Sequence, residues 1–239
     1  MSLDKYNSKR NFKKTKEPKG TKKSSKGALR FVVQKHAASR LHYDLRLEIN
    51  GVLVSWAVPK GPSANPADKR LAIQTEDHPM DYIDFEGIIP EGEYGGGTVI
   101  VWDQGTYRPE GNEDLNKENS LMKKQLQEGA IKIILKGEKL NGAYHMVLMK
   151  GDEEARQWLL MKSKDEFADP DYEFDEKSIL SGQTLDQFAA SARKNNNPSI
   201  EPGKASKKKL KELKNISMFL SSIHLKKCSI LKILQRPRK

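Results

Sequence analysis

The sequence has little of what builds secreted or membrane proteins. It contains a single cysteine, Cys228, which cannot form an internal disulfide, so we expect a protein of a reducing compartment, the cytoplasm. It has no run of about 18 apolar residues, which excludes a membrane-spanning helix. Its N-terminus is polar and rich in lysine, and it lacks the apolar stretch of a secretory signal peptide. These absences predict a cytoplasmic protein with no membrane partner.

Several motifs of catalysis and ligand binding are absent as well. The sequence has no serine-centred nucleophile elbow, and one cysteine cannot supply the cysteine pair of a zinc finger. The glycine-rich segment 92–97, which reads GEYGGG, lacks the Gly-Lys-Ser/Thr ending of a phosphate-binding loop and leads into a predicted strand. We therefore interpret this segment as a tight turn.

Charge is distributed unevenly over the 239 residues, whose formal net charge is +11. Residues 1–30 carry a net charge of +9 and residues 193–239 one of +12, whereas residues 31–192 carry −10. Basic arms bind nucleic-acid phosphates and release counterions, which gives an affinity that depends on salt but not on base sequence. The charge pattern therefore indicates a nucleic-acid partner, although two solvated lysine-rich tails would give the same pattern.

Composition divides the chain into three parts, a basic arm at 1–28, a folded domain at 29–193 and a basic C-terminal part at 194–239. The segment 13–25 has almost no apolar side chain and cannot contribute to a core. We therefore expect regular structure to begin near Leu29.

Alternation of apolar and polar residues predicts many short strands. The clearest pair is 42–49 and 52–58, which Asn50 and Gly51 join in the favoured two-residue type I′ turn. Further strands are expected at 29–34, 70–75, 98–102, 131–135, 142–149 and 157–162. Many short strands with few helices predict a mainly β fold, either a closed barrel or a sandwich, in which the three tryptophans belong to the core.

Two helices are expected in the domain. One spans 114–128 and ends before Gly129, and a capping box that begins at Thr184 opens a short helix that ends near Arg193. A linker follows at 195–206, and beyond it apolar residues recur at roughly helical spacing. These residues fit a helix that folds onto the domain or an amphipathic helix for a partner or a membrane surface.

The hairpin carries the first candidate site. The turn sets a register in which one face is apolar and the other presents His42, Asp44, Arg46 and Glu48. Side chains two residues apart on a strand lie about 7 Å apart on the same face, so a histidine and an aspartate can converge on one ion. The cross-strand neighbours on this face include Ser55 and an alanine, which are small and leave room for it.

His36 completes a candidate metal set with His42 and Asp44. Two imidazoles and one carboxylate suit Mn²⁺ or Zn²⁺ and leave open positions for water or phosphate. Arg46 lies one strand step beyond Asp44, where its guanidinium could bind a phosphate held at the metal. A solvated hairpin face would carry the same residue types, so the hairpin alone does not decide between a site and a surface.

A second polar cluster lies at 76–82, which reads EDHPMDY and follows a predicted strand. His78 precedes a proline, which favours an extended backbone, so its side chain could reach a site from a loop. A surface histidine is the alternative interpretation.

Long stretches of the sequence resemble one known family. Residues 31–62 read FVVQKHAASRLHYDLRLEINGVLVSWAVPKGP, and residues 76–103 read EDHPMDYIDFEGIIPEGEYGGGTVIVWD. Both stretches resemble the 3′-phosphoesterase module of bacterial DNA ligase D, an enzyme of non-homologous end joining, and its stand-alone versions in archaea and bacteria. The resemblance extends to 158–162 and covers roughly residues 6–190.

The resemblance implies a fold, an activity and a set of site residues. The family fold is a compact β-barrel flanked by helices, with the active site in a crescent-shaped groove. Its members use Mn²⁺ to remove a 3′-terminal ribonucleoside and then the remaining 3′-phosphate, which leaves a 3′-hydroxyl. The family's metal ligands match His36, His42 and Asp44, and its phosphate-binding and catalytic residues match Arg46, His78 and Tyr82. Supporting residues match Gln34, Arg70 and Glu76.

The family's N-terminal segment also contributes to activity. Its motifs match Arg10 and Glu17 here, and Asn11 stands where the family has an aspartate. No polymerase or ligase signature accompanies the module in this sequence.

These observations predict a Mn²⁺-dependent 3′-phosphodiesterase and 3′-phosphomonoesterase that acts on DNA and DNA/RNA primer ends, with other divalent transition metals as alternatives. We expect a monomer that works beside a separate ligase, polymerase or Ku-like protein. A non-catalytic end-binding module and a general metallonuclease are the alternative functions.

Overall fold

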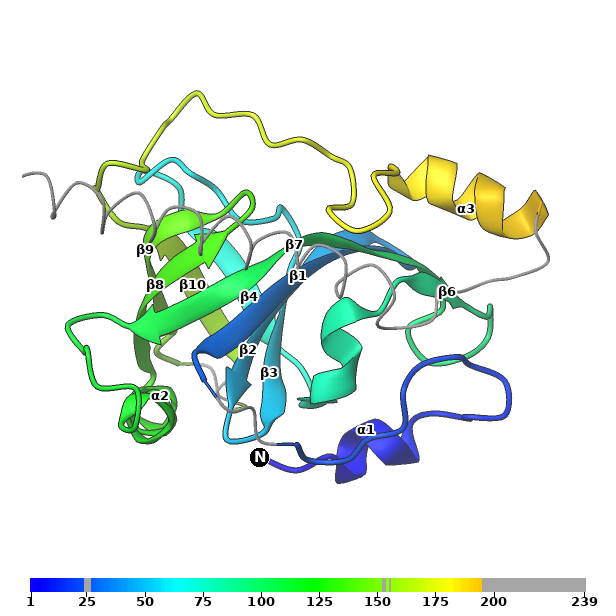
Figure 1. Cartoon of the computed structure of the whole chain (residues 1–239), viewed down its shortest axis with the longest axis horizontal. Coiled ribbons are helices and arrows are strands. Elements are labelled where there is room, and N and C mark those ends of the chain that lie inside the picture. The colour runs from blue at the N-terminus through cyan, green and yellow to red at the C-terminus, as the bar shows by residue number, and fades with distance from the viewer. Residues whose placement is uncertain (24–26, 152–153, 155, 195–239) are drawn as a thin grey trace, which may run out of the picture. The chain divides into compact units, whose positions relative to one another are not determined.

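A closed antiparallel β-barrel forms the centre of the molecule. The structure, a computed structural model, describes residues 1–23, 27–151, 154 and 156–194, all of which lie in the first of two units, Met1–Ile200 and Glu201–Lys239. The barrel strands follow the order β1-β2-β3-β4-β10-β9-β8-β7, and β7 pairs with β1 to close the ring (Figure 1). The mainly β fold with a closed barrel is therefore confirmed. The linker and helix predicted beyond residue 194 lie outside the described residues.

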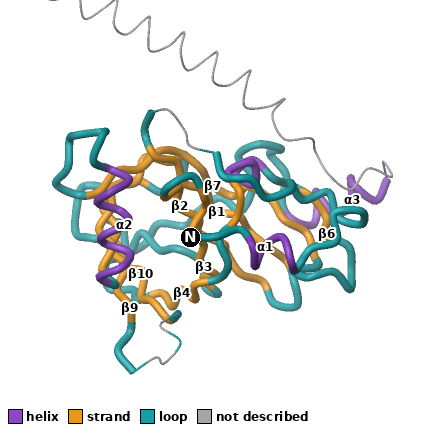
Figure 2. The backbone as a smooth tube through the Cα atoms, turned by 90° about the horizontal axis from the view of Figure 1, so that it is seen from below, coloured by secondary structure: helices purple, strands orange, loops and turns teal. Residues whose placement is uncertain are grey.

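All eight predicted strands are present, and the structure adds two short ones. The strands are β1 Leu29–Ala37, β2 Leu41–Ile49, β3 Val52–Val58, β4 Arg70–Gln74, β5 His78–Pro79, β6 Gly87–Ile89, β7 Gly97–Pro109, β8 Ala130–Gly137, β9 Asn141–Leu148 and β10 Gln157–Lys162. The helices are α1 Asp4–Ser8, α2 Glu118–Glu128, α3 Leu185–Lys194 and the 3-10 helix η1 Met80–Asp84. In both Figure 1 and Figure 2, α2 lies at one end of the barrel, and α1 and β6 lie towards the other.

The hairpin β2–β3 has the predicted register. Asn50 and Gly51 both adopt positive φ, as a type I′ turn requires, and Ile49 lies opposite Val52. Seven residue pairs follow from this turn, and they place Asp44 opposite Ala57. The polar face is nevertheless not solvated, because other segments cover it. Its buried residues are Asp44, Arg46, Glu48 and Ser55.

The predicted core residues pack inside the barrel. Trp56, Trp102 and Trp158 are all buried, and the rings of Trp56 and Trp158 meet edge to face with centroids 5.8 Å apart. Large aromatic side chains remove much apolar surface from water, and edge-to-face contacts between them add to that stabilisation. The tryptophans therefore serve the core, as predicted.

The helix boundaries agree with the sequence at the end of α2 and at the start of α3. Gly129 ends α2 in the left-handed conformation, and Thr184 and Gln187 form the predicted capping box at the start of α3. However, α2 begins at Glu118 rather than at residue 114. The side chains of Asn112 and Asp114 accept bonds from backbone N–H groups two residues ahead, and such turns compete with the helix.

Regular structure begins earlier than predicted. The expectation that it starts near Leu29 is wrong, because α1 lies near the N-terminus and buries Tyr6 completely together with Leu3. Phe12 also packs against the core, whereas residues 13–23 add no hydrophobic side chain to it but do bury Thr15 and Glu17. The N-terminal residues are therefore part of the packed structure.

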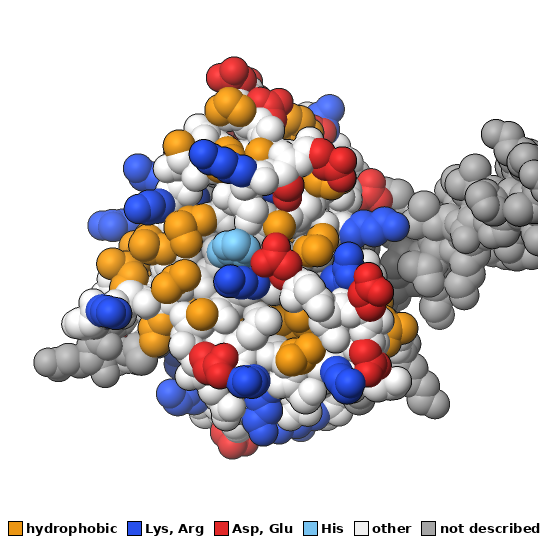
Figure 3. Space-filling view, turned by 90° about the vertical axis from the view of Figure 1, so that its left-hand side faces the viewer, with side chains coloured by type: hydrophobic (Ala, Val, Ile, Leu, Met, Phe, Trp, Pro, Cys, Tyr) orange, Lys and Arg blue, Asp and Glu red, His pale blue; other side chains and the backbone are white. Residues whose placement is uncertain are grey.

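The face on the side of β8 and β9 carries side chains of mixed character. Figure 3 shows acidic and basic side chains scattered over it and hydrophobic side chains gathered towards one side. Leu71 of β4 and Val147 of β9 are exposed, and both lie opposite Leu159 of β10. Within the described residues, no helix combines the length and apolar composition of a membrane span.

Candidate active site

The hairpin and two neighbouring segments assemble the candidate site. β2 contributes His42, Asp44 and Arg46, and β1, which pairs with β2, places His36 opposite His42. β5 pairs with β3 so that His78 lies opposite Leu53. The histidine on the loop is thereby brought onto the polar face of the hairpin, where it is buried.

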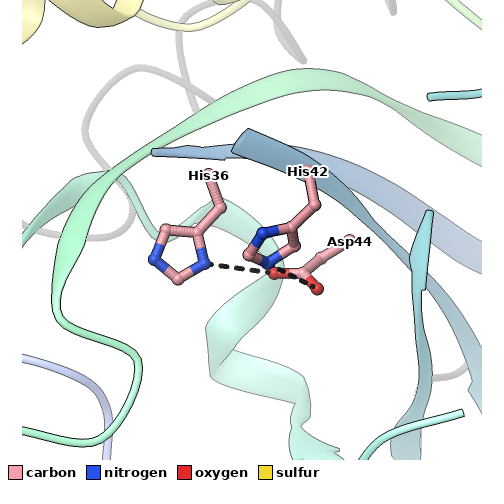
Figure 4. Close-up of side chains that lie close together, drawn as sticks. All are labelled: His36, His42 and Asp44. Carbon is pink, nitrogen blue, oxygen red and sulfur yellow. Dashed lines mark ion pairs between the residues drawn. The ribbon is translucent and has the colours of Figure 1, made fainter. Parts of the chain in front are cut away.

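Three side chains converge as a candidate metal centre. His36, His42 and Asp44 point towards one another, as Figure 4 shows, and their donor atoms lie within 4.8 Å of one another. His36 Nδ1 is 3.6 Å from one carboxylate oxygen of Asp44, and His42 Nε2 is 3.6 Å from the other. The structure thus brings together the three side chains that the sequence predicted to converge.

Backbone carbonyls orient both imidazole rings. His36 Nε2 lies 2.9 Å from the carbonyl oxygen of Gly95, and His42 Nδ1 lies 2.9 Å from that of Arg40. If each of these nitrogens carries the proton and donates it to the carbonyl, the other nitrogen of each ring presents a lone pair to Asp44. Bonds of this kind set the tautomer of metal-binding histidines.

The donor set fits a divalent transition metal. Nitrogen and oxygen ligands bind such ions at about 2.0–2.2 Å, which places neighbouring ligand atoms about 3–3.5 Å apart. The 3.6 Å separations are close to this value. Burial favours the neutral acid, but Arg46 and then His36 hold the pKa of Asp44 well below its usual value. The carboxylate is therefore charged and able to bind a cation.

Arg46 connects the candidate metal centre to His78. Its Nε donates to Gln34 Oε1 at 2.7 Å, and its Nη2 donates to Asp44 Oδ2 at 3.1 Å. Its Nη1 lies 2.9 Å from His78 Nδ1, and Tyr82 lies beneath the guanidinium at 5.0 Å from its ring centroid. Gln34 is itself fixed, because its amide donates to the carbonyls of Tyr82 and Phe85. The guanidinium is thus held rigidly.

His78 lies between two arginines. Arg46 approaches Nδ1, and Arg10 Nη2 lies 3.1 Å from Nε2. Burial, Arg46 and Arg10 together lower the pKa of His78 well below its usual value, so the ring is neutral at pH 7. A neutral imidazole can accept only one hydrogen bond, so it cannot satisfy both guanidinium groups. At least one guanidinium N–H group of Arg10 or Arg46 is therefore left without an acceptor on the His78 ring, and an anion beside the ring would accept its hydrogen bond.

The N-terminal arm packs against His78 and Tyr82 through Arg10 and Glu17. Arg10 donates to Glu17 at 2.9 Å and to Glu76 at 3.2 Å, and its guanidinium lies 3.8 Å from the ring centroid of Tyr6. Glu17 also accepts a hydrogen bond from the hydroxyl of Tyr82 at 3.0 Å. Burial and then Glu17 raise the pKa of Tyr82 well above its usual value, so the hydroxyl keeps its proton.

Two predicted site residues make their contacts elsewhere. Arg70 donates to Asp68 at 2.6 Å, beside its own strand rather than in the network around Arg46. The side chain of Asn11 accepts from the backbone N–H of Lys13 and so holds a turn within the arm. The other predicted residues, namely Arg10, Glu17, Gln34, His36, His42, Asp44, Arg46, Glu76, His78 and Tyr82, are brought together.

The structure adds two residues that the sequence did not single out, Tyr6 and Tyr94, and a contact of Ser55 that was not foreseen. Tyr6 stacks under Arg10, Ser55 lies 3.3 Å from His78, and Tyr94 accepts a hydrogen bond from Lys9 at 3.0 Å. Tyr6 carried one signal, as an aromatic residue in a lysine-rich segment. The glycine-rich segment was interpreted as a turn, which it is, but its carbonyl contact with His36 was not foreseen.

Comparison with known proteins identifies relatives. Residues 34–148 match the family described as the DNA Ligase D 3′-phosphoesterase domain. The multifunctional non-homologous end joining protein LigD of Pseudomonas aeruginosa is 48% identical over 190 residues, which are 77% of this chain and 22% of that protein. The LigD proteins of Mycolicibacterium smegmatis and Mycobacterium tuberculosis are 43% and 42% identical, cover 69% and 72% of this chain, and are each matched over 21% of their length. The chain thus spans about a fifth of the length of these relatives.

Proposed function

Residues 34–148 make this chain a member of the DNA ligase D 3′-phosphoesterase domain family, and from this premise we propose that it is a Mn²⁺-dependent phosphoesterase that heals 3′ ends. Its substrates are DNA and DNA/RNA primer strands. It removes a 3′-terminal ribonucleoside, then hydrolyses the 3′-phosphate, and leaves a 3′-hydroxyl. The family indicates phosphoester hydrolysis in DNA end repair, and the metal and the two reaction steps are the parts that we add.

One observation carries the proposal. Arg46 lies between the candidate metal centre and His78, and it contacts both, at 3.1 Å from Asp44 and 2.9 Å from His78. A phosphate group that meets a cation at Asp44 would therefore also meet the guanidinium. Arginine suits this task because its planar fork matches the geometry of phosphate oxygens.

Each residue of the pocket has a part in this reaction. Arg46 binds the phosphate and stabilises the charge that grows in the transition state, since it is preorganised by Gln34. His78 enters neutral and is positioned by Arg10 and the carbonyl of Glu76. Once protonated, it donates to the leaving oxygen or holds the phosphate. Tyr82 keeps its proton and holds Glu17, which in turn fixes Arg10. Arg70 and Asn11 have supporting roles outside this network.

His36, His42 and Asp44 would hold the cation. A divalent cation in this position supplies Lewis-acid chemistry, because it neutralises charge on a phosphate oxygen and makes a nearby water more acidic. Two imidazoles and one carboxylate suit Mn²⁺ and also accept Zn²⁺ and related ions. We further propose that the protein is a cytoplasmic monomer that works beside a separate ligase, polymerase or Ku-like protein.

An end-processing assay tests the proposal. A 5′-labelled strand that ends in a 3′-phosphate or in one ribonucleotide is incubated with the protein and Mn²⁺, with and without EDTA. We expect release of phosphate and of the terminal ribonucleoside only without EDTA. His42→Ala removes one of three metal ligands and is expected to lower phosphate release at least about 100-fold, even in excess Mn²⁺.

His145→Ala is the matched control. His145 lies on β9, where it contacts Glu110 and Ser163, and its replacement should leave release unchanged. Most of the activity surviving in His42→Ala would contradict the metal centre. Strand binding without release would favour a non-catalytic end-binding module, and a ladder of internal products would favour a general nuclease.

A further inference from the structure

The glycine-rich segment 92–97 runs close against the candidate metal centre. The carbonyl of Gly95 lies 2.9 Å from His36, and a Cβ atom at Gly97 would lie 2.1 Å from the carbonyl oxygen of Ala37 in β1. Only glycine allows the backbone to approach this closely. The segment is therefore fixed in place, and Tyr94 directly precedes the residue whose carbonyl contacts His36.

The hydroxyl of Tyr94 is anchored on its other side. Lys9 donates to it at 3.0 Å, and it donates to Glu76 at 3.3 Å. Glu76 also accepts from Arg10, whose guanidinium lies 3.1 Å from His78. Tyr94 is thus next in the chain to Gly95, which contacts the candidate metal centre, and is hydrogen-bonded to Glu76, which contacts Arg10.

The ring of Tyr94 is available for contact despite these anchors. Tyr94 is 47% exposed, and the ammonium group of Lys9 lies 4.2 Å from the centroid of its ring. An aromatic ring that is already held loses little conformational entropy when a ligand packs against it. A half-exposed, anchored tyrosine with these neighbours has the properties of a stacking platform for a base.

We propose that Tyr94 stacks against the base of the 3′-terminal nucleoside, so that it binds the end of the strand while the phosphate enters the pocket at Arg46. This inference rests on the proposed function, and it adds a contact with the nucleoside to the contacts with phosphate. Stacking is tolerant of base identity because every base has a π face. Tyr94 therefore favours strands with a terminal base without selecting which base it is.

Two nucleic-acid strands that differ only in the base of the 3′-terminal nucleoside test this role. Both end in a ribose at the 3′ position, but one ribose carries adenine and the other carries no base. Dissociation constants are measured with the full chain by fluorescence anisotropy in EDTA, and KM is then measured with Mn²⁺. We expect the wild-type protein to bind the base-bearing strand about 5- to 100-fold more tightly. Tyr94→Leu should remove this preference by weakening that strand alone.

Two further variants separate stacking from architecture. Tyr94→Phe loses the bonds to Lys9 and Glu76 but keeps the ring, so most of the preference should remain. Tyr172→Leu replaces an equally exposed tyrosine, whose ring packs on Phe174, and should change nothing.

The outcomes keep the two proposals apart. If Tyr94→Leu weakens both strands equally, or if the wild-type protein does not prefer the base, the stacking role is overturned. If the preference is present but Mn²⁺ yields no release from either strand, the stacking role stands and the proposed phosphoesterase activity fails.

Discussion

Asp103 is fully buried although it lies outside the candidate active site. Its carboxylate accepts hydrogen bonds from the backbone N–H groups of Glu138, Lys139 and Leu140, which form the turn between β8 and β9. Burial raises the pKa of Asp103 to about 6, against the opposing effect of these N–H groups. The folded protein therefore holds a proton on this group at pH values where the unfolded chain has lost it.

The sign of the resulting pH dependence follows from proton linkage. Between pH 4 and pH 6 the folded state binds more protons at Asp103 than the unfolded state, so the contribution of this group to stability falls as pH rises. Asp103→Asn cannot titrate. We expect the free energy of unfolding of wild type minus that of the variant to be about 2–3 kcal/mol larger at pH 4 than at pH 7. Urea denaturation of both proteins at the two pH values measures this difference.

The opposite result has a clear meaning. A difference that is equal at both pH values, or larger at pH 7, would mean that the three N–H groups hold the carboxylate ionised. The variant should be less stable at both pH values, because an amide has only one acceptor oxygen for these donors.

At the residue scale, local spacing could predict part of the site. His42, Asp44 and Arg46 alternate on one strand, so their shared face follows from the turn at Asn50 and Gly51. The resemblance to a known family then supplied Arg10 and the other distant partners. Contacts such as that of Lys9 with Tyr94 join segments 85 residues apart, and no local pattern encodes them.

At the scale of elements, the absence of a side chain at Gly97 allows β7 to pair closely with β1. A Cβ atom there would lie 2.1 Å from the carbonyl oxygen of Ala37, whereas Gly92 has nothing within 4 Å, and both have positive φ. We expect Gly97→Ala to lower the free energy of unfolding by at least about 3 kcal/mol, because backbone must move. Gly92→Ala should cost only about 1–2 kcal/mol, from its backbone conformation alone. Urea denaturation compares the two variants.

A second readout follows from the position of this contact. Ala37 is next to His36, so the displacement in Gly97→Ala should also weaken Mn²⁺ binding, measured by titration calorimetry. Equal costs for the two variants would show that β1 and β7 can separate freely at this point.

Strands long enough to show an alternation of apolar and polar residues could be predicted from the sequence, whereas the two shortest strands could not. β10 has the predicted bounds because its six residues alternate clearly between half-buried or exposed and buried positions. β5 and β6, with two and three residues, are too short for any periodicity, yet β5 carries His78. The element that completes the pocket is thus one that pattern reasoning does not detect.

At the scale of the whole molecule, much of the basic charge of the N-terminal arm is paired within the protein. Lys9, Arg10, Lys14 and Lys23 form ion pairs with acidic side chains, mostly of the domain. The sequence indicated a basic segment at each end of the chain that could bind nucleic-acid phosphates. The structure instead shows that the first arm also neutralises part of the acidic centre.

This pairing predicts which end of the chain dominates salt-dependent binding. Residues 195–239 carry most of the +12 charge of the C-terminal part. A chain that ends at residue 194 should bind a DNA strand with a slope of log K against log salt that is smaller by at least about 2 units. Its kcat for phosphate release should be unchanged. Anisotropy titrations from low to high salt give the slope, and an unchanged slope would assign the phosphate contacts to the first arm.

Closure of the barrel has a consequence for how the protein behaves at high concentration. Each of its eight strands is hydrogen-bonded on both sides, since β7 returns to β1. Intermolecular sheet growth starts from rows of unpaired backbone groups, and β1 and β2 are paired with a neighbouring strand on each side. The strands that carry the candidate metal ligands are thereby protected from edge-to-edge aggregation. Their sequences therefore do not need the charged or proline residues that protect an exposed edge strand.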